Sequence, residues 1–205
     1  FKVPSTVNKI GKRSFYGCEQ LAEVDLCDGL EEVGKSAFGG CKSLKRFKAP
    51  STLKAIGVGA FEGCEQLAKI ELCDGLVEIG PQAFKGCKSL NGAKFPSTVE
   101  KVGEEAFSFC GQLIGVNLCD DVVNIGKNSF HNCFSLRNAS LPPQTQALQC
   151  FKHGCHDLMK LFGSQQKICN ALKSRFDGLP VHKLIYHQSE CLLGLLTIDQ
   201  VKISI

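Results

Sequence analysis

The stretch that decides the fold is IGVGAFEGCEQL, residues 56–67, because the chain repeats its pattern every 23 residues. Its glycine, phenylalanine, cysteine and leucine each recur in six copies at that step. The four columns are Gly11, Gly34, Gly57, Gly80, Gly103 and Gly126; Phe15, Phe38, Phe61, Phe84, Phe107 and Phe130; Cys18, Cys41, Cys64, Cys87, Cys110 and Cys133; and Leu21, Leu44, Leu67, Leu90, Leu113 and Leu136. A fixed period of this length indicates stacked repeats, so we predict a solenoid.

A second period covers two coils. Alternate copies carry Pro-Ser-Thr, beginning at Pro4, Pro50 and Pro96, or Cys-Asp, beginning at Cys27, Cys73 and Cys119. This pattern indicates growth by tandem copying of a two-coil unit, which is physically easy because each coil contacts only its neighbours.

Within one coil, periodicity predicts the local structure. The alternation in Leu21-x-x-Val24-x-Leu26 is typical of a strand, and a second short inward run begins at Val33 or Ile56. The glycine that follows permits a turn with unusual dihedrals. Ala-Phe then forms a short helical corner. We therefore predict stacked parallel β coils with short helical corners and a hydrophobic spine of phenylalanines.

The pattern I-G-x-x-A-F-x-G-C-x-x-L, together with Pro-Ser-Thr-Val, resembles BspA-type leucine-rich repeats. The resemblance covers residues 1–162. It implies a parallel-β solenoid with a recognition role, since known members are non-enzymatic solenoids that bind other proteins. Members occur on bacterial cell surfaces and as expanded families in unicellular eukaryotes. The resemblance names no ligand.

The repeat pattern ends near Gly163, so we predict a solenoid over 1–162 and a helical C-terminal cap over 163–205. Ser164 is a suitable N-cap for a helix over about 165–177 whose apolar face would cover the last coil. The hexamer 179–184 is similar to an ankyrin-repeat start, but an ankyrin array needs several copies. Residues 189–205 follow no pattern that we can place.

Composition and charge exclude several classes of protein. The chain has 205 residues, 43% of them hydrophobic and 21% charged, which predicts a globular protein. The net charge of +4, with both signs interspersed, argues against a nucleic-acid partner. No apolar run is long enough for a membrane span. The chain begins at Phe1 without Met, so it is open whether it is a fragment of a longer protein.

The 13 cysteines allow three interpretations: buried reduced thiols, disulfides, or metal ligands. The repeat register favours thiols, because a free cysteine behaves as a small buried hydrophobe. So many free thiols favour the cytoplasm over the cell surface. The cluster Cys150, His153, Cys155 and His156, with Cys169 downstream, has the composition of a zinc site. Register places Cys150 and Cys155 in core columns, so we predict neither a metal nor a cofactor.

No catalytic constellation stands out from the repeat. Gly57-Val58-Gly59 sits in an ordinary coil turn without a long helix after it, which argues against a phosphate-binding loop. No Ser-His-Asp or Cys-His set is recognisable, and we predict that the chain is not an enzyme.

The outward residues of the stacked strands should form one continuous face. We predict a partner-binding surface there, formed by Arg46, Lys48, Lys69, Glu71, Lys94 and Asn117. The competing interpretation is a solvated face whose alternating charges pair with each other. The resulting hypothesis is a non-enzymatic scaffold that binds a protein partner. The alternative is a secreted or cell-surface adhesin of the same architecture; the oligomeric state is not predicted.

Overall fold

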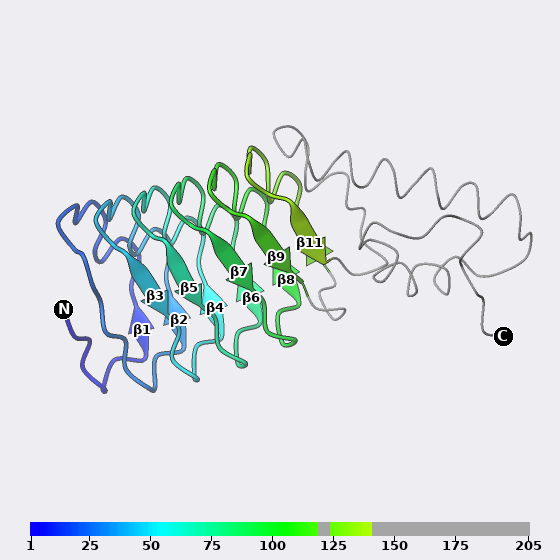
Figure 1. Ribbon diagram of the computed structural model, residues 1–205. Coiled ribbons are helices and arrows are strands. Elements are labelled where there is room, and N and C mark those ends of the chain that lie inside the picture. Colours follow the sequence, from blue (N-terminus) through cyan, green and yellow to red (C-terminus); the bar gives the residue numbers. More distant parts are fainter. Residues whose placement is uncertain (119–123, 141–205) are drawn as a thin grey trace, which may run out of the picture. The chain divides into compact units, whose positions relative to one another are not determined.

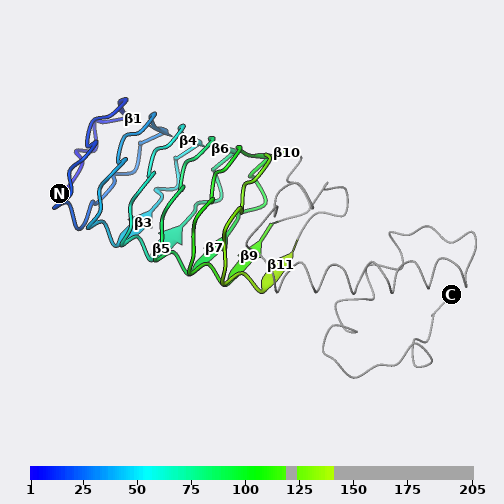
Figure 2. The same cartoon turned by 90° about the horizontal axis from the view of Figure 1, so that it is seen from above.

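The computed structural model describes residues 1–118 and 124–140. These residues form a solenoid of parallel β coils, as predicted, with strands on two opposite sides (Figures 1 and 2). One side is a six-stranded sheet, here called the back sheet, in the order β1-β2-β4-β6-β8-β10. Its strands are β1 (Lys9–Ile10), β2 (Glu32–Val33), β4 (Ala55–Ile56), β6 (Glu78–Ile79), β8 (Lys101–Val102) and β10 (Asn124–Ile125).

The opposite side carries the longer strands, and we call their outward surface the front face. These strands are β3 (Arg46–Lys48), β5 (Lys69–Glu71), β7 (Gly92–Lys94), β9 (Gly115–Asn117) and β11 (Asn138–Ser140). They form a two-stranded sheet, β3-β5, and a three-stranded sheet, β7-β9-β11. In β3 and β5 the middle residue is buried and the two outer residues are exposed, as the alternation of a strand requires.

The phenylalanine column is the predicted spine. From Phe15 to Phe130 the successive ring centroids lie 5.1–5.5 Å apart, and their planes are within 16° of parallel. Phe38, Phe61, Phe84, Phe107 and Phe130 are fully buried. Small alanines such as Ala37 and Ala60 precede the rings and are also fully buried. The spine therefore forms the centre of the core.

Two coils place an additional phenylalanine differently. In β3 the inward residues are Phe47 and the following Ala49, whereas β7 and its extension have Ala93 and Phe95. All four are buried. Phe47 packs at a tilt on Phe61 with ring centroids 4.5 Å apart, while Phe95 contacts Phe107 edge-on at 5.4 Å. One strand thus offers two slots two residues apart, and either slot can hold the ring.

The predicted helical corners are wrong: over the described residues, the corners are turns and no helix is present. In the corner at 36–40 the backbone N–H groups of Ser36, Phe38 and Gly40 donate to carbonyls of the next coil at 2.7–2.8 Å. An α-helix would direct these N–H groups along its own axis to residues four positions earlier. Ser36 and Gly40 also have φ of +50° and +72°, which interrupts a right-handed helix.

The role predicted for the glycine column is also wrong. None of its described members has the positive φ that would require glycine. The reason is close approach between coils. A Cβ on Gly34 would lie 2.7 Å from the Ile10 carbonyl oxygen, and one on Gly57 would lie 2.8 Å from the carbonyl carbon of Gly34. Each coil therefore rests backbone to backbone on the preceding coil at this column.

The cysteine column is a ladder of hydrogen-bond donors. Each thiol from Cys41 to Cys133 donates to the carbonyl of the spine phenylalanine one coil back, over Sγ–O distances of 3.1–3.3 Å. These five cysteines are buried and free, as predicted, while Cys18 is exposed. The column is occupied by cysteine because its position needs a small side chain that also donates.

The two-coil period has a similar cause. The Cys27 thiol donates to the Pro4 carbonyl over 3.0 Å, and in the next coil the Thr52 hydroxyl donates to the Leu30 carbonyl over 2.8 Å. Two coils further on, the Cys73 thiol donates to the Leu53 carbonyl over 3.3 Å, and the Thr98 hydroxyl then donates to the Leu76 carbonyl over 2.8 Å. Successive coils thus satisfy a carbonyl of the preceding coil by two different donors. The predicted boundary at 162, the C-terminal cap, the ankyrin-like hexamer, Cys119 and the cluster from Cys150 to Cys169 lie outside the described residues.

Candidate protein-interaction face

The six residues predicted for the site all lie on the strands of the front face. Arg46 and Lys48 begin and end β3, and Lys69 and Glu71 begin and end β5. Strand pairing places Arg46 beside Lys69 and Lys48 beside Glu71. The predicted register of these rows is therefore confirmed.

The β3-β5 half of the front face neutralises much of its own charge. The Arg46 guanidinium lies 3.6 Å from the Glu23 carboxylate in the preceding coil. The Lys69 ammonium lies 2.6 Å from the Glu71 carboxylate in its own strand, and this hydrogen bond lowers the pKa of Glu71. Arg46 thus pairs between coils, as the alternating signs predicted, but Lys69 pairs within β5. All these groups are exposed, so each pair contributes little to stability.

The β7-β9 half differs in character. Lys94 of β7 pairs in register with Asn117 of β9, and both side chains are exposed. No carboxylate occurs in β7, β9 or β11. Gly92 and Gly115 pair in register beside them, and a Cβ added to Gly92 would meet no atom within 4 Å. This half presents its backbone and a few polar side chains without internal charge pairing.

The structure does not join the six residues into one continuous sheet. Strands β5 and β7 are neighbours, but they belong to separate sheets. Arg46, Lys48, Lys69 and Glu71 form one group, and Lys94 and Asn117 form the other. The repeat keeps its length at this point, but Asn91-Gly92 replaces the usual strand residues, and this departure in the sequence coincides with the interruption.

Exposed apolar residues near the later coils escaped the sequence prediction. Ile114, immediately before β9, is 51% exposed, and Phe134 is 61% exposed. Phe109 is 45% exposed and has φ of +62°, although earlier coils have glycine at its position. A bulky residue in this region of φ is uncommon. Comparing the outward columns would have found all three, because they stand where earlier coils carry Gly, Ala, Asn, Lys or Glu.

The described residues offer no recognisable catalytic or metal centre. No group of three or more potential ligands among His, Cys, Asp and Glu converges within residues 1–118 and 124–140. The Ser108 hydroxyl donates to the His131 backbone carbonyl, not to its ring. Burial raises the pKa of Cys41 to about 11, which keeps this thiol protonated at neutral pH. In the same part of the chain, no helix has the length and apolarity needed to cross a bilayer.

A family model and one solved structure agree with this architecture. A family model described as "BspA type Leucine rich repeat region (6 copies)" matches residues 1–110 and 59–170. The crystal structure of a leucine-rich repeat protein from T. pallidum is 33% identical in sequence, covering 67% of this chain and 76% of its own, with a TM-score of 0.59. A leucine-rich repeat protein from Bacteroides ovatus is 20% identical, covering 77% of this chain and 76% of its own, with a TM-score of 0.37. No sequence among the curated proteins matches.

Proposed function

The chain belongs to the BspA-type leucine-rich repeat family, and from this premise we propose that it is a non-enzymatic scaffold whose front face binds a protein partner. The matched family and the T. pallidum structure support the coarser statement that it is a repeat scaffold. The finer proposal concerns the surface it uses, which we assign to Arg46, Lys48, Lys69, Glu71, Lys94 and Asn117.

The observation that carries the proposal is the arrangement of the front strands. Their outer residues lie in rows, one residue from each coil, at a spacing of ~4.8 Å between neighbouring strands. Such rows match a partner that contacts several coils together, as extended solenoid surfaces do. Lys94 and Asn117 at the ends of β7 and β9 are exposed, and so is Ile114, immediately before β9. This half offers polar and apolar contacts that the fold itself does not use.

The thiol ladder supports a reducing compartment over the adhesin alternative. Five buried cysteines act as hydrogen-bond donors, and oxidation would remove the S–H group from each. Oxidising compartments promote disulfides, whereas reducing ones keep thiols free. Counting free thiols in protein isolated from its native source under non-reducing conditions tests this choice. Mostly free thiols support the scaffold in a reducing compartment, and multiple disulfides support the adhesin.

Site-specific photocrosslinking tests the face itself. A benzoylphenylalanine at Asn117 or Lys48 should form discrete crosslinked products in native extract. The same residue at Lys101, which is exposed on the back sheet, is the matched control and should not form those products. Identical products from both faces would contradict the proposal.

The captured partner then allows a quantitative measurement. Charge reversal by Arg46→Glu with Lys48→Glu should weaken its binding about tenfold or more, since it inverts the charge that this half of the face presents to the partner. The control is Lys54→Glu with Lys101→Glu on the other side of the solenoid. Unchanged binding by the front-face variant would exclude the β3-β5 half from the interface.

A further inference from the structure

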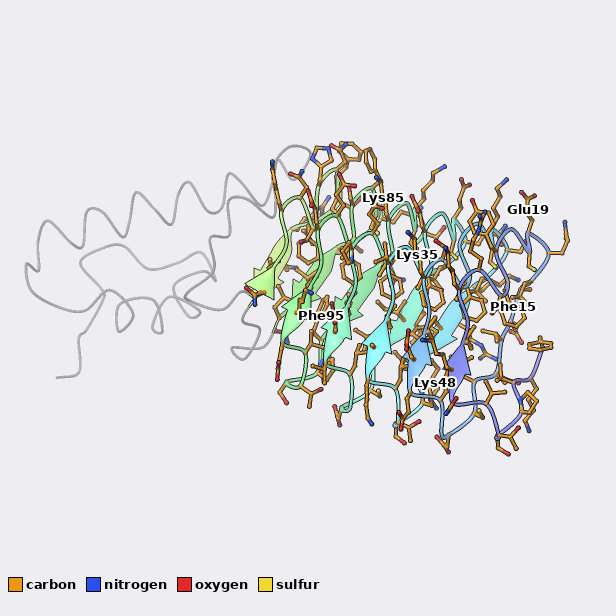
Figure 3. The ribbon with its side chains drawn as sticks, turned by 180° about the vertical axis from the view of Figure 1, so that it is seen from behind. Phe15, Glu19, Lys35, Lys48, Lys85 and Phe95 are labelled. Carbon is orange, nitrogen blue, oxygen red and sulfur yellow. The ribbon has the colours of Figure 1, made fainter. Side chains whose placement is uncertain are left out.

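We propose that a second interaction site lies at the corner formed by Lys12, Arg13, Tyr16 and Lys35, here called the basic corner, and that it binds an acidic segment of a partner protein. The chain leaves the back sheet for the turns at Lys12 and Lys35, and Figure 3 labels Lys35 there. The site lies outside the front face, so it stands or falls independently of the function proposed above.

Backbone contacts bring the three cations together from two coils. The Arg13 N–H donates to the Lys35 carbonyl over 2.9 Å. A Cβ on Gly34 would lie 3.1 Å from the Lys12 nitrogen, so the chain at Lys12 rests directly against the chain just before Lys35. The side chains of Lys12, Arg13 and Lys35 are all exposed. Three positive charges therefore occupy one corner of two adjacent coils.

Tyr16 gives this corner a defined geometry. The Arg13 guanidinium carbon lies 4.1 Å from the centre of the Tyr16 ring, a cation–π arrangement. The ring in turn lies over Gly39 of the next coil, where an added Cβ would be only 3.0 Å from a ring carbon. Glycine at this position thus leaves room for the ring. Stacking orients the guanidinium and leaves its edge free for a carboxylate, which guanidinium groups bind through two parallel hydrogen bonds.

The charge pattern of several other coils differs from that of this group. There a cation stacks on a carboxylate of the preceding coil, as in Lys42 on Glu19 at 2.7 Å and Lys88 on Glu65 at 2.9 Å. The like-charged neighbours Arg46 and Lys69 each have a carboxylate within 4 Å, as described above. Lys12 and Lys35 occupy the same column of adjacent coils with the same sign.

None of the three cations in the corner forms an ion pair with a described residue. The Tyr16 ring contacts Arg13 but carries no counter-charge. An external anionic group would supply one.

The extent of the corner selects the ligand. Val58 occupies the Lys35 column in the following coil and Glu62 the Tyr16 column, so the positive surface ends after two coils. Two coils span ~5 Å, which suits two or three carboxylates of a peptide. A protein that binds a nucleic-acid duplex contacts about 6–10 of its phosphates. This corner is too short to make that many contacts.

Fluorescence anisotropy with a labelled peptide of alternating glutamate and serine tests the site on the full chain. The variant Lys12→Gln, Arg13→Gln, Lys35→Gln should bind at least about tenfold more weakly than the wild type. The control Lys54→Gln, Lys101→Gln, Lys127→Gln removes the same charge from exposed positions outside both the basic corner and the front face, and should change binding less than about twofold. Equal weakening in both variants, or none in the first, would overturn the proposal.

Two further measurements separate the alternatives. Tyr16→Phe keeps the ring and should bind like the wild type, whereas Tyr16→Leu should weaken binding about threefold because Arg13 loses its platform. Equal binding by both would refute the positioning role of Tyr16. Competition with duplex DNA and with phosphatidylserine vesicles completes the test. Tighter binding of either competitor at the basic corner would replace the acidic protein segment as its ligand and overturn the assignment.

Discussion

The placement of the extra phenylalanine offers a strict test of how these coils pack. The perturbation moves the ring by two residues within one strand, through Phe47→Ala together with Ala49→Phe. The result copies the arrangement that the chain already has at Ala93 and Phe95. The two sites are matched, because the coils on either side of each carry branched aliphatic residues at both inward positions.

The two single substitutions set the expected loss of unfolding free energy. Phe47 is 1% exposed and packs on the spine at 4.5 Å, so Phe47→Ala should cost about 3–5 kcal/mol of unfolding free energy. Ala49→Phe inserts a ring beside an occupied slot and should cost about 1–3 kcal/mol. If the effects added, the double variant would lose about 4–8 kcal/mol. We expect a loss below about 1.5 kcal/mol, because the swap conserves volume.

Guanidinium denaturation followed by far-ultraviolet circular dichroism measures all three variants, and the coupling energy comes from the double-mutant cycle. The reciprocal exchange, Ala93→Phe with Phe95→Ala, is the matched control. A double variant as unstable as the sum of its single changes would refute the interchangeable slots. It would show that each ring is fixed by its own neighbours.

Three further predictions concern other columns. Gly80→Ala should lower the free energy of unfolding by about 2 kcal/mol or more, because its Cβ would lie 2.9 Å from backbone atoms of the preceding coil. Gly92→Ala faces open space and should be neutral or stabilising. Thermal melting of both variants measures the difference. Cys18 is exposed and should react with Ellman's reagent in the native protein. Burial raises the pKa of Cys64, so this thiol should react only on unfolding. Equal reaction rates of the two thiols would contradict the buried thiol ladder. Hydrogen bonds from the Lys85 ammonium and then from the Gln82 amide lower the pKa of Glu105, so its carboxylate contributes stability above pH ~4.5 that is lost as the pH falls. Glu105→Gln should therefore cost about 0.5–1 kcal/mol at pH 7 and progressively less as the pH is lowered below ~4.5, by denaturation at each pH.

The repeat register made most of the core predictable. Once Phe61 is assigned to the spine, every 23rd residue must face the same way, and the burial of Cys64 and Leu67 follows from the same register. The same logic correctly placed Arg46 beside Lys69 on the front face. Register predicts which residues are neighbours because the coils are translated copies of one another.

Register does not predict how the backbone uses its hydrogen bonds. The Ala-Phe corner looks helical in isolation, but the N–H of Phe38 is taken by the next coil. Lys69 pairs with the carboxylate of Glu71 in its own strand and not with one in a neighbouring coil. The repeat columns do not predict which side-chain rotamer is adopted. In the basic corner, register makes Lys12 and Lys35 neighbours, but the contact of Arg13 with the Tyr16 ring required the structure.

Because cysteine and threonine donors alternate from coil to coil, a change in the number of coils has different effects when that number is even and when it is odd. Deleting residues 24–69, two whole coils, would bring Glu19 against Lys88 and keep a Pro-Ser-Thr coil beside a Cys-Asp coil. Deleting residues 47–69 alone would stack Lys42 on Lys88 and place two Cys-Asp coils together. Lengthening or shortening by an even number of coils preserves the alternation of the two coil types. An odd change leaves one mismatched junction, so this protein is expected to vary in length by steps of 46 residues, twice its 23-residue repeat.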